Sequence, residues 1–178
     1  MLYRFRVISD EEEDFLRDID IRSDQTFLDL HKIIQESAGY DSSQIASFFI
    51  TDDNWEKGEE IPLLNMTGDD SAGITVMEKA VISEYISKEK EKLLYVFDYF
   101  SGRAFFISLS KIIKEDKNKK YPCCSRSVGK PPPQIVLGDL NINDIFDEEL
   151  NKIFGEEDDG DNDKSDPHEN IDDYKDLL

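Results

Sequence analysis

The sequence predicts an α+β fold in which one principal helix packs across a mainly antiparallel sheet. Two observations lead to this prediction. Several short segments alternate between apolar and polar residues, as half-buried strands do, and one longer segment carries an apolar stripe at helical spacing. The strand-like segments also come in neighbouring pairs with short polar connections, which is typical of hairpins. We expect residues 1–154 to form one α+β domain, followed by an acidic, flexible tail at residues 155–178.

The first expected elements are two paired strands. In residues 2–8 the apolar side chains of Tyr3, Phe5 and Val7 alternate with arginines, so one face of a strand would be buried. Residues 15–21 alternate in the same way. The acidic stretch between these segments reads as the loop of a hairpin.

The strongest helix signal follows this hairpin. An apolar stripe at helical spacing consists of Phe27, Leu30, Ile34 and Ala38. Ser23 or Asp24 is the expected N-cap, because short polar side chains accept hydrogen bonds from the first free backbone N–H groups. Gly39 is expected to end the helix, since glycine tolerates a left-handed backbone.

Further strands are expected in the rest of the domain. Residues 47–51 and 93–100 are rich in aromatic and β-branched side chains, and Ser101-Gly102 supplies a tight turn to a returning strand at 104–109. Residues 74–87 fit a strand or a helix equally well, and residues 144–154 predict a short late helix. This order of elements is similar to that of a β-grasp.

Composition excludes several classes of protein. The chain has 178 residues and a net charge of −20, and a strongly acidic surface repels nucleic-acid phosphates, so nucleic acid is an unexpected partner. No apolar run is long enough to span a bilayer, and residues 1–14 lack the apolar core of a secretory signal, so we expect a cytoplasmic protein. The two adjacent cysteines, Cys123 and Cys124, are expected to be free thiols in a loop.

The charge is unevenly distributed. Residues 155–178 carry a net charge of −9 and few apolar side chains, so they cannot bury enough surface to offset the entropy of ordering. Residues 111–130 carry a net charge of +5. This basic segment is interpreted either as a solvated connector or as a contact patch for the tail or an acidic partner, formed by Lys117, Lys119, Lys120, Arg126 and Lys130.

Several motifs occur in an order that resembles the root-inducing-plasmid ORF-three-like family. The Leu-His-x-x-Ile-Gln helix of that family matches Leu30–Gln35, and its Gly-Trp-Asp turn matches Gly39–Asp41. The family's Tyr-x-Tyr-Asp-Phe-Gly-Asp-x-Trp-x-His strand pair matches Tyr95–Phe105 in its Tyr, its Asp and its aromatic character. Its Gly-Asp, Trp and second His have no counterpart here.

The resemblance covers about residues 1–155 and implies the fold and a bacterial cytoplasmic setting. The family has no established activity, although some members travel on plasmids and mobile elements. Because Tyr95 and Asp98 are retained from its motif, the resemblance makes both candidates for a functional site. The replaced polar residues make an inherited catalytic activity less expected.

Two side chains are candidates for a catalytic pair. His31 lies at the margin of the helix stripe, where it is either a structural hydrogen-bonding group or a proton-transfer group paired with Asp98 from a facing strand. Asp98 stands in an apolar strand, so it is either on the open face or buried with partners. Trp55 is either an exposed binding aromatic or a cap on one end of the core.

No metal site, cofactor motif or established catalytic motif is predicted. The acidic run 158–163 lacks the glycine and the glutamate that a calcium-binding EF-hand loop needs, and Gly129-Lys130 lacks the rest of a phosphate-binding loop. We therefore expect a non-enzymatic protein-interaction module. The alternatives are an accessory protein for DNA transactions of mobile elements, and a small enzyme that uses His31 and Asp98.

Overall fold

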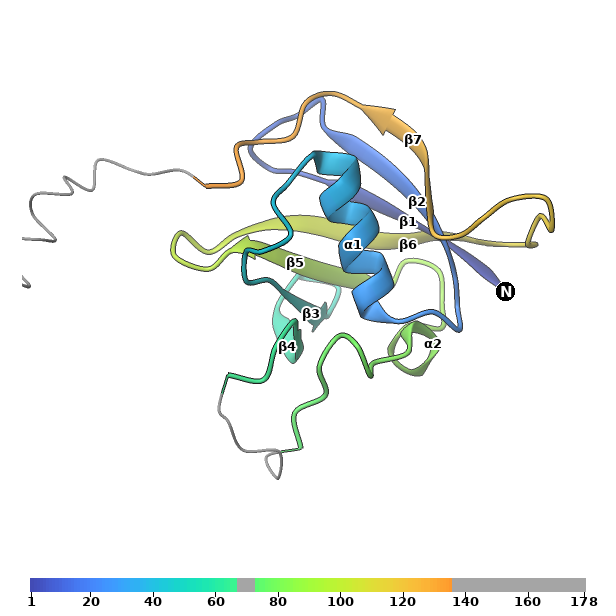
Figure 1. Ribbon diagram of the computed structural model, residues 1–178, viewed down its shortest axis with the longest axis horizontal. Helices are drawn as coiled ribbons and strands as arrows, with labels where there is room; N and C mark the ends of the chain where they lie inside the picture. The colour runs from blue at the N-terminus through green and yellow to red at the C-terminus, as the bar shows by residue number, and fades with distance from the viewer. Residues whose placement is uncertain (67–72, 136–178) are drawn as a thin grey trace, which may run out of the picture. The chain divides into compact units, whose positions relative to one another are not determined.

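The computed structural model describes residues 1–66 and 73–135, and shows a seven-stranded sheet with helix α1 lying across one face (Figure 1). All neighbouring strands pair antiparallel, in the order β4-β3-β5-β6-β1-β2-β7. In chain order the elements are β1 Leu2–Ile8, β2 Leu16–Arg22, α1 Phe27–Ala38, β3 Ser47–Thr51, β4 Lys57–Pro62, α2 Ile82–Tyr85, β5 Lys92–Asp98, β6 Arg103–Ile113 and β7 Cys123–Val128.

The predicted α+β class is confirmed: a mainly antiparallel sheet carries one principal helix. The closer likeness to a β-grasp is not confirmed, and the observed feature is an antiparallel sheet of seven strands. The late helix at 144–154 and the tail at 155–178 lie outside the described residues. The domain boundary at residue 154 stays a prediction, and the compact unit that holds the described residues runs from Met1 to Val136.

The core lies between α1 and the sheet face that it covers. In β1, Phe5 pairs with Ile19 of β2 and with Leu109 of β6, and all three are fully buried. Phe15 stacks on Phe105 with ring centroids 4.8 Å apart. The alternation seen in the sequence therefore selects the buried face, because successive side chains of a strand point to opposite sides.

The N-cap of helix α1 lies three residues after the earliest predicted cap. The N-cap is Thr26, not Ser23 or Asp24, and it forms a capping box with Asp29 in which each side chain accepts from the other residue's backbone N–H. Gly39 ends the helix as predicted, with a φ of 67°. The N-cap is later than predicted because residues 23–25 form the turn that leads from β2 into the helix.

Neither edge strand, β4 or β7, is predicted by the sequence pattern. β4 contains glycine, proline and two exposed glutamates, and β7 was interpreted as part of a basic loop that holds free thiols. Cys123 and Cys124 are free, as expected, but they lie in β7 instead of a loop. Edge strands bury little surface and carry polar side chains, so they lack the apolar pattern that identifies inner strands. The ambiguous segment 74–87 contains the single helical turn α2.

A buried arginine ties the end of β7 to the body of the domain. Arg17 is 4% exposed, and its guanidinium donates to backbone carbonyls of Leu16, Ser37, Val128 and Gly129. No carboxylate pairs with it among the described residues, and burial lowers its pKa. Ser37 lies in the last turn of α1, where the negative end of the helix dipole favours a cation.

Candidate functional site

A tyrosine hydroxyl held between two side chains of α1 forms the centre of the candidate site. His31 and Gln35 are four residues apart on the helix and project from the same face. Tyr95, in the middle of β5, has its hydroxyl 2.8 Å from His31 Nδ1, and Gln35 Nε2 donates to that hydroxyl at 2.5 Å. All three side chains are buried. A polar contact therefore joins the helix to the sheet within an otherwise apolar core.

The hydrogen bonds assign the tautomer of His31. The Tyr95 oxygen accepts from Gln35, and its proton has no acceptor other than His31 Nδ1 among the described residues, so we assign the Tyr95 hydroxyl as the donor to that nitrogen. A neutral imidazole that accepts at Nδ1 carries its proton on Nε2. Burial, and to a smaller extent the charge of Lys32, lowers the pKa of His31 to about 4. At pH 7 His31 is therefore a neutral ring with an N–H donor at Nε2.

The residues that follow β7 extend this chain of hydrogen bonds. Gln134 Nε2 lies 3.5 Å from Gln35 Oε1, which leaves the Gln35 amide oriented with its nitrogen toward Tyr95. Gln134 also accepts from the backbone N–H of Asp41 at 2.7 Å and donates to the Asp41 carbonyl at 2.9 Å. Tyr40 donates to the carbonyl of Pro132 at 2.7 Å. The proline-rich segment thus fastens the turn after α1.

His31 borders a groove of about 500 Å³ beside α1, which we call the His31 groove. Besides His31 and Gln35, it is lined by Leu28, Lys32, Glu36, Tyr40, Ser42 and Leu63. Among the described residues, the buried side-chain atoms that have no hydrogen-bond partner are Thr51 Oγ1 and Asp98 Oδ2. His31 Nε2 also has no hydrogen-bond partner among the described residues, but it is not one of these buried atoms. The 2% of His31 that remains exposed therefore includes Nε2.

Asp98 lies at the end of β5 and does not meet His31. Its Oδ1 accepts from the backbone N–H groups of Phe100 and Ser101, at 3.1 and 3.2 Å, and its Oδ2 lies 3.6 Å from Arg103 Nη1. The sequence left open whether Asp98 lies on the open face of the sheet or is buried with partners. Asp98 is 8% exposed, so it is buried. The structure does not bring together the pair that an enzymatic role would require, because the partner of His31 is Tyr95.

Arg103 is a polar centre that sequence analysis missed. Its guanidinium makes two hydrogen bonds to the Glu11 carboxylate, at 2.8 and 2.7 Å, and lies 5.2 Å from the centre of the Phe97 ring. The partner Glu11 is 92 positions away in the sequence, in the β1–β2 loop. No pattern in the neighbouring sequence predicts a contact over this separation.

Trp55 packs on the sheet face opposite α1. Its ring meets the edge of Phe106 at 4.9 Å between centroids, and the Lys92 ammonium lies 5.0 Å from its centre. The backbone of Trp55 has a φ of 66°, and the side chain is partly buried. Neither proposed role describes it fully, since the ring covers an outer apolar side chain instead of the main core.

The residues of the predicted basic patch are spread along β7 and beyond both of its ends. Lys117, Lys119 and Lys120 precede this strand, Arg126 lies on it, and Lys130 follows it. A strand of six residues spans about 20 Å, so the five side chains do not form one cluster.

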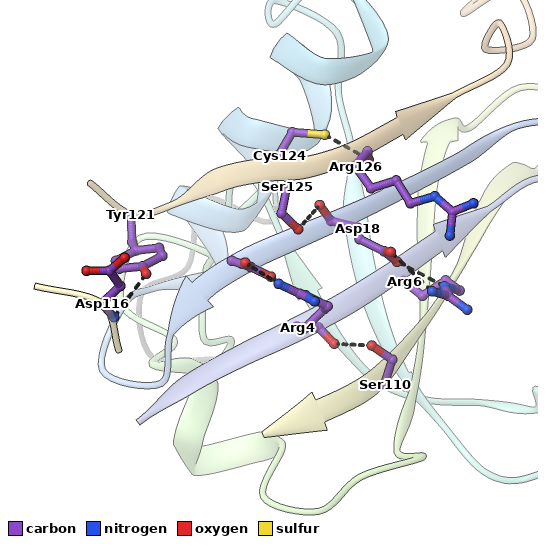
Figure 2. Close-up of polar contacts among 10 residues, drawn as sticks. Arg4, Arg6, Asp18, Ser110, Asp116, Tyr121, Cys124, Ser125 and Arg126 are labelled. Atoms are coloured by element: carbon purple, nitrogen blue, oxygen red, sulfur yellow. Dashed lines mark hydrogen bonds and ion pairs between the residues drawn. The ribbon is translucent and has the colours of Figure 1, made fainter. Parts of the chain in front are cut away.

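The neighbouring open face of the sheet is largely neutralised (Figure 2). Arg4 binds Asp20 through two hydrogen bonds of 2.6 and 2.7 Å, and Arg6 binds Asp18 through two of 2.9 and 3.1 Å. These pairs follow from the register of β1 and β2, in which each arginine stands opposite its aspartate. The paired arginines are occupied and do not extend the predicted patch.

An exposed apolar surface lies at the other side of the sheet, beside the edge strand β4. Six of the ten most exposed large apolar side chains of the described residues line one groove of about 600 Å³ there. We call this surface the apolar patch, and it consists of Ile45, Leu64, Met66, Ile74, Tyr99 and Phe100. Phe100, at the β5–β6 turn, is fully exposed.

The rim of the apolar patch carries a fixed carboxylate. Glu60 Oε1 accepts from the Ser47 hydroxyl at 2.7 Å and from the Tyr99 hydroxyl at 2.5 Å, and Ser47 and Tyr99 also contact each other. Burial, together with the hydrogen bond to Glu60, raises the pKa of Tyr99 to about 12. The phenol therefore keeps its proton and holds Glu60 in place, next to Glu59 in the lining of the groove.

Comparison with known proteins identifies the family. The model of the plasmid pRiA4b ORF-3-like protein family matches residues 2–167. The chain belongs to this family. A search among curated proteins gives no match.

A solved structure shares the fold. It is the crystal structure of a protein of unknown function, MM3350, from Methanosarcina mazei Go1, with 21% sequence identity and a TM-score of 0.60. The alignment covers 93% of this chain and 95% of that one. Neither the family nor this relative carries an assigned activity.

The described residues show no group of three or more histidine, cysteine, aspartate or glutamate side chains placed to bind a metal ion. In the same part of the chain, every helix is too short or too polar to cross a membrane.

Proposed function

We propose that this protein is a non-enzymatic interaction module, whose apolar patch binds a basic, apolar segment of a partner protein. The observation that carries the proposal is the concentration of exposed apolar side chains beside β4, with Phe100 fully exposed and Met66 and Leu64 exposed by 76% and 61%. Surface apolar residues are usually scattered, and a contiguous group next to a groove is typical of an interaction site.

Charge favours a basic partner. Among the described residues, the lining of the groove includes the carboxylates of Glu59 and Glu60 and no lysine or arginine. Glu60 is held by two hydroxyl groups, so it needs little reorganisation to accept a hydrogen bond from a lysine or arginine side chain. Such a complementary pair would contribute more to specificity than to affinity.

The position of β4 favours an extended partner segment. β4 is the last strand at its side of the described sheet and pairs with β3 alone. An exposed strand edge offers backbone groups to an added strand, while alternate side chains of that strand enter neighbouring pockets. A segment with alternating basic and apolar residues would satisfy the edge, the carboxylates and the apolar groove together.

An enzymatic role has less support. His31 is neutral at pH 7 with its proton on the exposed nitrogen, so it is a hydrogen-bond donor and not a general base. A role in DNA transactions is also less supported, since the basic side chains divide between the two ends of β7. The free thiols of Cys123 and Cys124 agree with the cytoplasmic location that we propose.

The test is binding of a synthetic seven-residue peptide of alternating lysine and leucine to the full chain, measured by calorimetry. Glu60→Gln and Phe100→Ser should each weaken binding by roughly tenfold. Glu13→Gln, which removes the same charge from the exposed β1–β2 loop, should leave the affinity unchanged. Val128→Ser, on the opposite edge strand, is the matched control for Phe100.

The proposal would be rejected by either of two results. One is equal weakening by Glu60→Gln and Glu13→Gln, which would show that only the net charge attracts the peptide. The other is equal affinity for a peptide with glutamate in place of lysine.

A further inference from the structure

We propose that the His31 groove is a binding site for a small organic carboxylate, which accepts a hydrogen bond from His31 Nε2–H. This site is separate from the apolar patch and does not depend on the interaction role. It rests on an almost completely buried ring whose Nε2 donor has no partner among the described residues and reaches solvent at the groove.

The donor can find an acceptor only in the groove. Within the described residues, Nε2 is not among the buried atoms that lack a hydrogen-bond partner, so it is open to the groove, where water or a ligand can accept its hydrogen bond. His31 is 2% exposed, and its other nitrogen already accepts from Tyr95. A structural role would need only the Nδ1 contact. The donor at Nε2 is therefore left for an acceptor that enters from the groove.

The donor is held in place before any ligand binds. The Tyr95 hydroxyl orients the ring, Gln35 orients that hydroxyl, and Gln134 orients the Gln35 amide. Gln134 is anchored in turn to the backbone of Asp41 at 2.7 and 2.9 Å. Such an arrangement lowers the entropy cost of binding, since the recognising group does not have to be ordered first.

The groups around the donor favour a carboxylate over other acceptors. Lys32, one residue after His31 on α1, lines the same groove and has no ion-pair partner within the described residues. One neutral N–H and one ammonium group match the two oxygens of a single carboxylate. A phosphate dianion would need more donors and would be repelled by Glu36, while a neutral amide would gain nothing from the charge of Lys32.

The walls of the groove limit the ligand to a compact apolar body. Leu28 and Leu63 contribute aliphatic surface, and Tyr40 contributes part of an aromatic ring. A volume of about 500 Å³ is in the range of small-molecule sites and admits a branched chain of a few carbons. Isobutyrate is a suitable probe, and isobutyramide is its uncharged counterpart of the same shape.

The test is a titration of the ¹⁵N-labelled full chain with isobutyrate at pH 7, followed by the NMR signal of His31 Nε2. We expect a saturable shift with a millimolar Kd, and binding of isobutyramide at least about tenfold weaker. The signal of His168, the other histidine of the chain, should not change. The absence of a saturable His31 shift at roughly 20 mM isobutyrate, or equal affinity for the two probes, would overturn the proposal.

Variants at the rim test the site without disturbing the buried contacts. Lys32→Gln should weaken isobutyrate binding by about five- to tenfold and leave isobutyramide binding unchanged. Lys114→Gln, an exposed lysine that follows β6, is the matched control and should have no effect. Glu36→Gln should strengthen binding, because it removes a like charge from the groove. Equal effects of Lys32→Gln and Lys114→Gln would contradict the assigned role of Lys32.

Discussion

The buried, neutral state of His31 makes the stability of the protein depend on pH in a predictable direction. The folded-state pKa is lowered from 6.5 to about 4, chiefly by burial. Above pH 6.5 the ring is neutral in the folded and the unfolded chain, so it makes no difference to stability. As the pH falls below 6.5, the unfolded chain binds a proton that the folded chain does not. The free energy of unfolding therefore decreases between pH 6.5 and pH 4 and is constant again below that window.

The size of this effect follows from the two pKa values. Between pH 7 and pH 5 the full shift corresponds to a loss of about 2 kcal/mol from the free energy of unfolding. The groove admits water to one edge of the ring, which screens part of the interaction, so we expect a loss of between about 1 and 2 kcal/mol. His31→Gln should remove this part of the pH dependence, whatever its effect on stability at pH 7.

Urea unfolding at pH 7 and pH 5 provides the measurement. The chain has two histidines, so His168→Gln is the matched control and should keep the full pH dependence of the unmodified protein. The contribution of the carboxylates to the pH dependence is common to all three proteins and cancels in the comparison. If His31→Gln keeps the whole pH dependence, or if His168→Gln loses it, the assignment of a low pKa to His31 is refuted.

Three further substitutions test the contacts that hold the domain together, each by urea unfolding at pH 7. Tyr95→Phe leaves His31 Nδ1 and the Gln35 amide without their shared partner and should cost about 1–3 kcal/mol, while Tyr121→Phe, at an exposed hydroxyl, should cost less than about 0.5 kcal/mol. Arg17→Lys loses the fork of donors to backbone carbonyls and should cost about 2 kcal/mol. Gly129→Ala should cost more than about 2 kcal/mol, because its Cβ would lie 2.3 Å from the Asp14 carbonyl oxygen.

Each of these predictions has an outcome that contradicts it. Equal costs for the two tyrosine variants would show that the buried hydroxyl is not a structural partner. An Arg17→Lys protein as stable as the original would mean that one ammonium group replaces the whole fork. A tolerated Gly129→Ala would require the β1–β2 loop to move away from β7 without cost.

The elements of the inner sheet and the helix could be predicted because their signals are local. Phe5 and Ile19 are buried on one face by the two-residue repeat of their own strands, and the stripe from Phe27 to Ala38 is set by the turn of its own helix. The edge strands β4 and β7 could not be found in the same way. They bury few side chains, so their residues show no repeat.

The candidate site was predictable only in part. His31, Tyr95 and Asp98 were identified from their residue types and from the resemblance to a family, but of the two alternatives given for His31, the pairing with Asp98 is not the one that the contacts show. A β-bulge between Val96 and Asp98 interrupts the alternation of β5, so the position of Asp98 cannot be read from strand parity. Asp98 stands opposite Arg103 at the end of the strand, where the backbone of the following turn and the guanidinium of Arg103 engage its carboxylate, away from His31.

The amino-acid sequence by itself determined the fold class, the family and the identity of the polar residues, because repeats and motifs lie within single segments. Tertiary structure alone decided which of those residues meet. Gln134 reaches Gln35 across 99 positions, and Arg103 reaches Glu11 across 92. Such contacts depend on how the whole sheet is ordered and on where α1 crosses it. Short-range patterns carry no information about either, because the position of each strand in the sheet is set by burial of all the apolar faces together.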